Sequence, residues 1–138
     1  MNIEKVDLVS HGDSRGQLVA IEEYDEIPFK IKRVYYIYDT NSDVTRGCHA
    51  HRTLKQLLVC VSGNCKIRLD DGKESQIVLL DKPNEGILIC DTIWREMFDF
   101  SKDAVLLVLA SDIYDEKDYI RDYQEFLKYV TDKGNGKL

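Results

Sequence analysis

The sequence has little that would keep the chain from folding, because only two prolines and eight glycines occur in 138 residues. Disordered segments are rich in such residues, so their scarcity argues against disorder. The sequence also lacks an excess of positive charge: 25 acidic residues outnumber 19 Lys and Arg, for a net charge of −6. This balance gives no electrostatic basis for binding nucleic acid or an anionic membrane.

Long apolar runs are absent too. No stretch approaches the ~18 apolar residues of a membrane span, and the first ten residues alternate in charge without an apolar segment of signal-peptide length. We therefore expect a cytoplasmic protein. The four cysteines form no C-x-x-C pair, so reduced thiols are favoured over disulfides or a structural zinc site; they are Cys48, Cys60, Cys65 and Cys90.

What the sequence does contain is a series of short segments with β-branched residues or alternating polarity, separated by turn signals. Such segments, spaced about 8 to 12 residues apart, predict an all-β sandwich or barrel. We expect one domain over 1–138, with the barrel at about 17–111. The expected strands are 17–21, 31–38, 56–61, 65–69, 76–80, 86–90, 93–98 and 104–110.

The C-terminal segment has a different period. Its apolar residues recur at helical spacing, which predicts an amphipathic helix over about 115–131 that packs against the barrel. Asp112 or Asp115 is expected near the helix start. The apolar residues are Tyr119, Ile120, Tyr123, Phe126, Leu127 and Val130.

Residues 46–51, Arg-Gly-Cys-His-Ala-His, hold two of the three histidines of the chain. On a strand, His49 and His51 share one face, so both are expected to point into the mouth of the barrel. An unperturbed imidazole has a pKa near ~6.5, which suits proton transfer at neutral pH. The alternative is that both histidines are structural polar residues.

The spacing around the histidines resembles the first cupin motif, G-(x)5-H-x-H-(x)3,4-E-(x)6-G. His49 and His51 are followed by Gln56 and then Gly63, while the leading glycine falls at Asp43. The resemblance implies a cupin, or jelly-roll, β-barrel. A segment from Pro83 and Gly86 to the expected strand 93–98 resembles the second cupin motif.

In metal-binding cupins, the two histidines, the glutamate and a histidine of the second motif hold the metal. Gln56 takes the place of the glutamate and Arg95 that of the last histidine. An amide is a poor ligand and a guanidinium repels a cation, so the sequence predicts no metal. A metal-dependent cupin oxygenase remains the less favoured alternative.

Longer segments resemble the nucleotide-sugar 3,4-ketoisomerases, which are metal-free cupins acting on dTDP-4-keto-6-deoxy-D-glucose. The similarity extends from about Gly12 to Tyr123, nearly the whole chain. It includes 27–29, 31–37, 46–47, 49–51, 94–97, 99–100, 108–111, 114–116 and 118–121.

The resemblance implies an isomerase that moves the carbonyl from C4 to C3 through an enediol. Two proton transfers accomplish this, so no cofactor is expected. We assign His49 as the base, His51 as its partner in shuttling or orienting, Tyr35 as a hydroxyl near the sugar and Arg95 as the stabiliser of the enediolate. The product would go to a pyridoxal-phosphate aminotransferase that makes a 3-amino-3,6-dideoxyhexose, a class of sugar associated with lipopolysaccharide.

Three arginines are candidates for binding the diphosphate of the dTDP-sugar, because a guanidinium recognises phosphate through paired hydrogen bonds. They are Arg15, Arg33 and Arg46. The resemblance also implies a homodimer that exchanges an N-terminal strand, in which case Arg15 would serve the site of the neighbouring subunit.

The family divides by the C4 configuration of the product. The galacto branch tends to carry Arg and His at the positions of Arg15 and Arg95, and the gluco branch Tyr and Arg. This chain combines Arg15 with Arg95, and we expect the gluco product or a mixture. A 3,5-epimerase acting on the same nucleotide sugar and a non-catalytic sugar-binding cupin remain open as alternatives.

Overall fold

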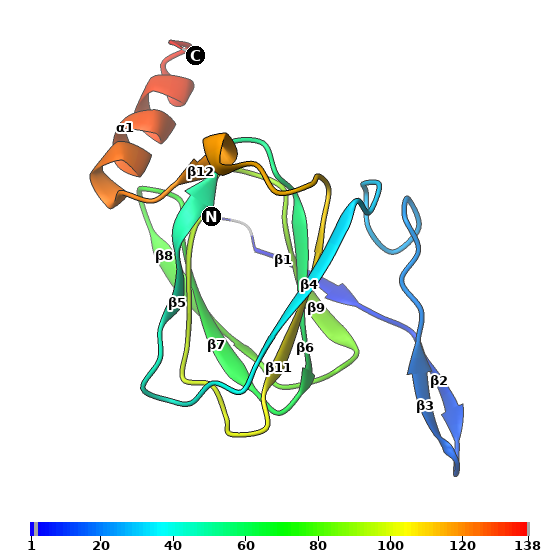
Figure 1. Ribbon diagram of the computed structural model, residues 1–138. Helices are drawn as coiled ribbons and strands as arrows, with labels where there is room; N and C mark the ends of the chain where they lie inside the picture. The colour runs from blue at the N-terminus through cyan, green and yellow to red at the C-terminus, as the bar shows by residue number, and fades with distance from the viewer. Residues whose placement is uncertain (2, 138) are drawn as a thin grey trace.

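The computed structural model describes residue 1 and residues 3–137, and most of their strands belong to two five-stranded antiparallel sheets (Figure 1). The first sheet has the order β1 (Glu4–Asp7), β9 (Glu85–Ile89), β6 (Gln56–Ser62), β11 (Val105–Ala110) and β4 (Arg33–Tyr38). The second has the order β12 (Tyr119–Ile120), β5 (Arg46–His51), β10 (Trp94–Phe98), β7 (Cys65–Asp70) and β8 (Ser75–Leu80). This is the predicted all-β, cupin-like barrel.

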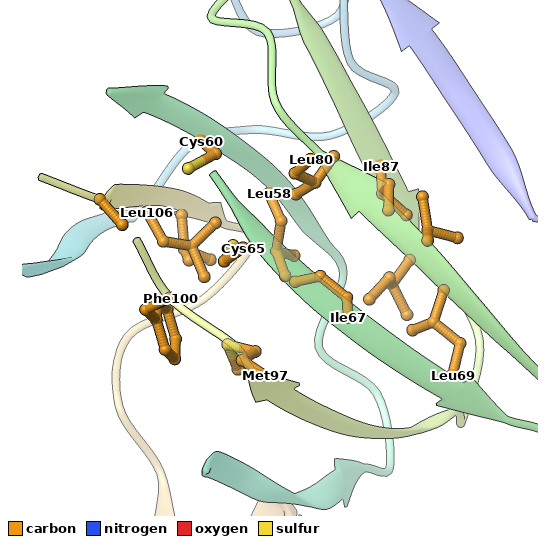
Figure 2. Packing of buried hydrophobic residues seen from close by; sticks show 14 residues of the cluster. Leu58, Cys60, Cys65, Ile67, Leu69, Leu80, Ile87, Met97, Phe100 and Leu106 are labelled. Atoms are coloured by element: carbon orange, nitrogen blue, oxygen red, sulfur yellow. The ribbon is translucent and has the colours of Figure 1, made fainter. Parts of the chain in front are cut away.

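An apolar cluster fills the space between the sheets (Figure 2). Alternate residues of β6, β7 and β11 point into it, as the period of a strand requires. Cys60 and Cys65 belong to this cluster, and all four cysteines are free thiols. The apolar cluster consists of Leu58, Cys60, Cys65, Ile67, Leu69, Val78, Leu80, Ile87, Ile89, Met97, Phe100, Ala104, Leu106 and Val108.

The N-terminal region departs from the prediction of a barrel strand at 17–21. β2 (Ser10–Asp13) and β3 (Gly16–Val19) pair only with each other, and this hairpin projects away from both sheets (Figure 1). Its residues are exposed except for the half-buried Val19, so no buried face ties β3 to the barrel. β1, which the sequence did not predict, pairs with β9 instead.

The C-terminal helix α1 (Tyr123–Gly134) begins later than the predicted position near residue 115. Tyr119 and Ile120 have helical spacing, but they pair with the edge of β5 as β12. Asp122 is the N-cap and accepts a hydrogen bond from the Glu125 amide. The predicted packing against the barrel is confirmed, because Phe126 of α1 is buried against β5 and β10.

The start of the C-terminal segment is a short 3-10 helix, η1 (Glu116–Asp118), which Asp115 caps. Together with β12 it takes up the residues that the sequence assigned to the first turns of α1. No helix in residues 3–137 is long and apolar enough to span a membrane.

Candidate active site

A bulge in β5 directs the two histidines into the barrel. Opposite β5, Arg95 pairs with His49 and the next residue of β10, Glu96, pairs with Gly47, which leaves Cys48 as an extra residue. Gly47 has φ +88, and a Cβ there would lie 3.2 Å from the Arg95 carbonyl oxygen. The predicted common face of the histidines is confirmed, since their ring centroids are 4.8 Å apart.

A hydrogen-bonded chain runs from His49 through His51 to Asp118. The Nε2 atoms of the two histidines are 3.1 Å apart, and Nδ1 of His51 lies 3.0 Å from Oδ2 of Asp118. Oδ1 of Asp118 accepts hydrogen bonds from the Thr53 amide at 2.7 Å and from the Thr53 hydroxyl at 3.0 Å. These bonds fix the carboxylate that faces His51.

The chain of hydrogen bonds also assigns the tautomers of the neutral histidines. A carboxylate can only accept, so His51 carries its proton on Nδ1 and presents a bare Nε2. His49 must then donate from Nε2, which leaves its Nδ1 without a proton. That Nδ1 is buried and has no hydrogen-bond partner among the described residues. His49 therefore has an unused basic lone pair.

The environment keeps both histidines neutral. His49 is 8% exposed and His51 is 1% exposed. Burial, with the nearby charge of Arg95 as the second cause, lowers the pKa of His49 to about 4 and that of His51 to about 3. At neutral pH both histidines are uncharged, so the pair can accept a proton, which suits a general base.

A second chain links Arg95 to Tyr35. Arg95 is 1% exposed; its Nη1 donates to Oε1 of Gln56, while its Nε and Nη2 donate to the Ile93 carbonyl oxygen at 3.2 and 3.0 Å. Nε2 of Gln56 donates to the Tyr35 hydroxyl at 3.1 Å. Tyr35 thus accepts from Gln56 and keeps its own hydrogen for another acceptor.

Burial lowers the pKa of Arg95 to about 10 and raises the pKa of Tyr35. At neutral pH, Arg95 is therefore a cation and Tyr35 a neutral donor. Gln56 and Arg95 stand where the cupin resemblance places two of the metal ligands, and they do not fit a metal. The Arg95 guanidinium is hydrogen-bonded to the Gln56 amide, which would have to coordinate the metal. Within residues 3–137, no three side chains of His, Cys, Asp or Glu converge on one point.

A cavity of about 310 Å³ opens at the mouth of the barrel. Arg33 and Tyr35 of β4 share the face that the strand period predicts, and the Arg33 guanidinium lies 5.4 Å from the Tyr35 ring centroid. Arg121 stacks 4.3 Å from the Tyr119 ring centroid and pairs with Glu116 at 2.7 and 2.9 Å. The cavity is lined by Arg33, Tyr35, Ile37, Arg46, Gly47, His49, Met97, Tyr119 and Arg121.

Most of the residues singled out from the sequence meet here. His49, Tyr35, Arg33 and Arg46 line the cavity, and His51 contacts His49 from behind. Arg95 lies deeper and reaches the cavity through Gln56 and Tyr35.

Arg15 does not join them. It lies at the tip of the β2–β3 hairpin, where its side chain is 89% exposed and pairs with Asp13 at 2.7 Å.

Besides Gln56, which the sequence marked only as a poor metal ligand, three residues of the site had been assigned no role from the sequence: Asp118, Tyr119 and Arg121. They lie in 118–121, a segment that resembles the ketoisomerases, so a signal was present. Their helical spacing suggested that they belonged to α1. The structure instead places Tyr119 against both histidine rings, with centroids 5.0 Å from His49 and 4.4 Å from His51.

The fold and the site together define a cupin barrel that presents a neutral histidine pair beneath an arginine-lined cavity. Residues 1–131 match the protein-family model described as FdtA: WxcM-like, C-terminal. The chain is 57% identical over 119 residues, 86% of each chain, to the TDP-4-oxo-6-deoxy-alpha-D-glucose-3,4-oxoisomerase of Aneurinibacillus thermoaerophilus.

Solved structures agree with this match. A 3,4-ketoisomerase from Helicobacter canadensis superposes with a TM-score of 0.93 at 50% identity, over 96% of this chain and 99% of that one. A mutant of the 3,4-ketoisomerase from Thermoanaerobacterium thermosaccharolyticum, in complex with TDP-4-keto-6-deoxyglucose, gives 0.93 at 44% identity over 96% of each chain. This chain belongs to the FdtA, WxcM-like family and is an enzyme of the sugar 3,4-ketoisomerase class.

Proposed function

We propose that this enzyme converts dTDP-4-keto-6-deoxy-D-glucose into a dTDP-3-keto-6-deoxyhexose, the precursor of a 3-amino-3,6-dideoxyhexose. The observation that carries the proposal is the neutral, buried His49 on the wall of the arginine-lined cavity. The complex of the T. thermosaccharolyticum relative with TDP-4-keto-6-deoxyglucose supports this substrate.

The reaction needs a base at C3 and a donor to the enediolate. His49 takes the C3 proton, which the adjacent C4 carbonyl makes acidic, and the electron pair of the C–H bond enters the enediolate. The Tyr35 hydroxyl donates a hydrogen bond to the enediolate oxygen. The charge of Arg95 polarises this hydroxyl through Gln56, which lies between the two residues. The proton on O3 passes to O4, a proton is returned to C4, and the carbonyl forms at C3. Electrons and protons balance without a redox cofactor.

The diphosphate would lie among the arginines at the mouth of the cavity. Arg33 and Arg46 were proposed for this role, and Arg121 adds a third guanidinium. Nε of Arg33 is buried and has no hydrogen-bond partner among the described residues, so this atom does not bond the guanidinium to another protein group. In a protein of net charge −6, this local positive cluster supplies the attraction that the overall charge does not.

The proposal is tested by incubating the protein with dTDP-4-keto-6-deoxyglucose in D2O, trapping the product with a 3-aminotransferase and identifying the sugar by NMR. A 3-amino-3,6-dideoxyhexose formed by wild-type protein and not by His49→Asn supports the isomerase. Unchanged substrate would favour a sugar-binding protein, and deuterium at C5 a 3,5-epimerase.

The same spectrum gives the C4 configuration, for which we propose the gluco product or a mixture. In the galacto branch a histidine takes the position of Arg95, and a histidine can donate a proton near neutral pH. Arg95 holds its protons, since its pKa is about 10 and it donates to Gln56 and Ile93. A clean galacto product would overturn this assignment.

We further propose that 1–138 acts as one cupin domain within a homodimer, in which the β2–β3 hairpin crosses to the partner and carries Arg15 to its site. Asn2 and Leu138, which the prediction also covered, lie outside the described residues. The hairpin pairs with no strand of its own barrel. In addition, β4 is an edge strand, and its outer face exposes Val34, Tyr36 and Tyr38. Both features favour a partner of the same kind.

Two measurements test this dimer. Light scattering over a dilution series that found only monomer would refute it. Mixing inactive Arg15→Ala and His49→Asn subunits is the sharper test, because a mixed dimer would contain one site with both native residues. Activity should then reappear on mixing. No recovery after verified subunit exchange would place Arg15 outside the partner's site.

The proposal also includes a cytoplasmic location, where nucleotide sugars are available, and use of the amino sugar in lipopolysaccharide. Activity confined to the membrane fraction of a cell lysate would contradict the location.

A further inference from the structure

The cavity at the mouth of the barrel has one apolar wall. Of the described residues that line this cavity, only Ile37 and Met97 have apolar, non-aromatic side chains. Met97 is 3% exposed and belongs to the apolar cluster (Figure 2), and the half-buried Ile37 packs against the same cluster. The apolar cluster therefore reaches the surface of the cavity at these two residues.

This apolar wall adjoins the groups proposed to carry out the reaction. Ile37 follows Tyr35 by two residues on β4, so both side chains lie on the inner face of the strand. Met97 follows Arg95 by two residues on β10 in the same way. Tyr35 and Arg95 lie at one level of the barrel, because Gln56 is hydrogen-bonded to both. Residues two apart on a strand are roughly 7 Å apart, so a substituent next to the reacting carbons can touch the wall.

Gly47 leaves room for Met97 in this wall. A Cβ atom at Gly47 would lie 3.1 Å from Cε of Met97, which is tighter than ordinary van der Waals contact, so a larger residue would displace the methionine. The thioether side chain is flexible and polarisable, which lets it fit closely around a small apolar group. Arg46 pairs with Met97 across the strands but is exposed, so its guanidinium extends away from the wall into solvent or toward the diphosphate.

The other end of the cavity is charged and aromatic. Arg33 precedes Tyr35 by two residues on β4, and its guanidinium lies 5.7 Å from the Tyr114 ring centroid. The Tyr114 and Tyr119 ring centroids are 5.4 Å apart, and Arg121 stacks on Tyr119. Phosphate oxygens would form hydrogen bonds with these guanidinium groups, whereas a methyl group would remove water from them without compensation. The two ends of the cavity therefore suit opposite ends of a nucleotide sugar.

We propose that Ile37 and Met97 select 6-deoxy sugars by binding the C6 methyl group of the substrate. C6 is bonded to C5, which is bonded to C4, so a sugar held with C3 and C4 beside His49 and Tyr35 has its C6 within reach of the wall. A methyl group gains free energy when it leaves water for an apolar surface. A C6 hydroxyl would lose its hydrogen bonds to water and find no partner on these side chains. The inference rests on the proposed function and deepens it, because it names residues that choose the substrate.

The test compares two ligands that differ by one oxygen atom. The ligands are dTDP-6-deoxy-D-glucose and dTDP-D-glucose, and neither can isomerise because both lack the C4 carbonyl. Their Kd values are measured by isothermal titration calorimetry. We expect wild-type protein to bind the 6-deoxy sugar about 10- to 100-fold more tightly, the discrimination that an apolar pocket achieves against an added hydroxyl.

A matched pair of variants at position 37 isolates the polarity of the wall. Valine and threonine have nearly the same shape and are both β-branched, so Ile37→Val and Ile37→Thr should preserve the strand equally. Ile37→Val should keep the preference for the 6-deoxy sugar. Ile37→Thr offers the C6 hydroxyl a hydrogen-bond partner, so its preference should be about five- to tenfold smaller than that of Ile37→Val. Ile77→Thr makes the same change at a position 61% exposed on β8 and should match wild type.

The outcomes distinguish the inference from the proposed function. A wild-type protein that binds neither nucleotide sugar contradicts the proposed function itself. A wild-type protein that binds both with equal Kd overturns the selection of 6-deoxy sugars and leaves the isomerase intact. An equal preference in Ile37→Val and Ile37→Thr also overturns the inference. If Ile37→Thr does not fold, Met97→Leu and Met97→Gln replace the pair, with the same expected difference and the same contrary result.

Discussion

Two groups of side chains share the barrel interior, and each contains side chains that are almost completely buried. Leu106 of the apolar cluster is 0% exposed and Arg95 of the polar cluster is 1% exposed. Here the polar cluster means Tyr35, His49, His51, Gln56 and Arg95.

Burying the apolar cluster stabilises the fold without directional demands, at about 25 cal/mol per Å² of apolar surface. Burying the polar cluster costs free energy that hydrogen bonds only partly recover. The comparison teaches that the apolar cluster stabilises the barrel, while the polar cluster is retained for chemistry. Substitutions in the apolar cluster should therefore change the free energy of unfolding, and substitutions in the polar cluster should change the activity.

The largest effect is expected from the polar cluster. His49→Asn removes the base but keeps a polar side chain, so kcat/KM should fall roughly 10²- to 10⁴-fold or more. Thermal unfolding followed by circular dichroism should change little. A variant that retained more than about a tenth of the wild-type kcat/KM would show that His49 is not the base.

The apolar cluster should show the reverse behaviour. Leu106→Ala removes a fully buried side chain and should lower the free energy of unfolding by about 2 to 5 kcal/mol, measured by urea denaturation. The activity of the folded fraction should be close to wild type. Leu79→Ala, at a position 46% exposed on β8, is the matched control and should cost much less. Equal losses for both variants would contradict the assigned core.

Acid should destabilise the protein through the polar cluster. The pKa of each histidine is lower in the folded state, about 4 and 3, than near 6.5 when unfolded, so the unfolded chain binds more protons below pH 6.5. The free energy of unfolding should therefore fall as pH drops from about 6.5 toward 4, by about 1.4 kcal/mol per pH unit for each histidine. Urea denaturation of His49→Asn, His51→Asn should give a flatter dependence; an equal slope would argue against these shifts.

The smallest effect should separate the two causes of the shifts. Burial is the larger cause of the low histidine pKa values and the charge of Arg95 the second. Arg95→Gln removes the charge, so the pKa of His49 and of His51, followed by NMR, should rise but stay below 6.5. Lys66→Gln, which removes an exposed charge paired with Asp99, should leave both unchanged. Values unaltered in Arg95→Gln would mean that burial alone is responsible.

The sequence predicted those parts of the molecule that local periodicity controls. The shared face of His49 and His51 and that of Arg33 and Tyr35 follow from the period of a strand and are confirmed. Arg95 was placed correctly beside the pair through its resemblance to a cupin motif.

What the sequence did not predict depends on partners far along the chain. Asp118 bonds to His51 across 67 residues, and Gln56 to Arg95 across 39. Tyr119 and Ile120 fit both a helix and a strand, and only the free edge of β5 decides between them. The projecting hairpin follows from the absence of a buried face, which the alternation within 17–21 did not reveal.

The bulge at Cys48 decides which change in chain length the site would tolerate. Directly opposite residues of paired strands share a face, and His49 already lies opposite Arg95 while Gly47 lies opposite Glu96. Deleting Cys48 would therefore remove the extra residue and leave both imidazoles facing the barrel. Deleting Ala50, in the regular part of the strand, would instead place His49 and His51 on opposite faces. The enzyme can therefore lose its active site through a three-nucleotide deletion that preserves the reading frame and every residue with a chemical role.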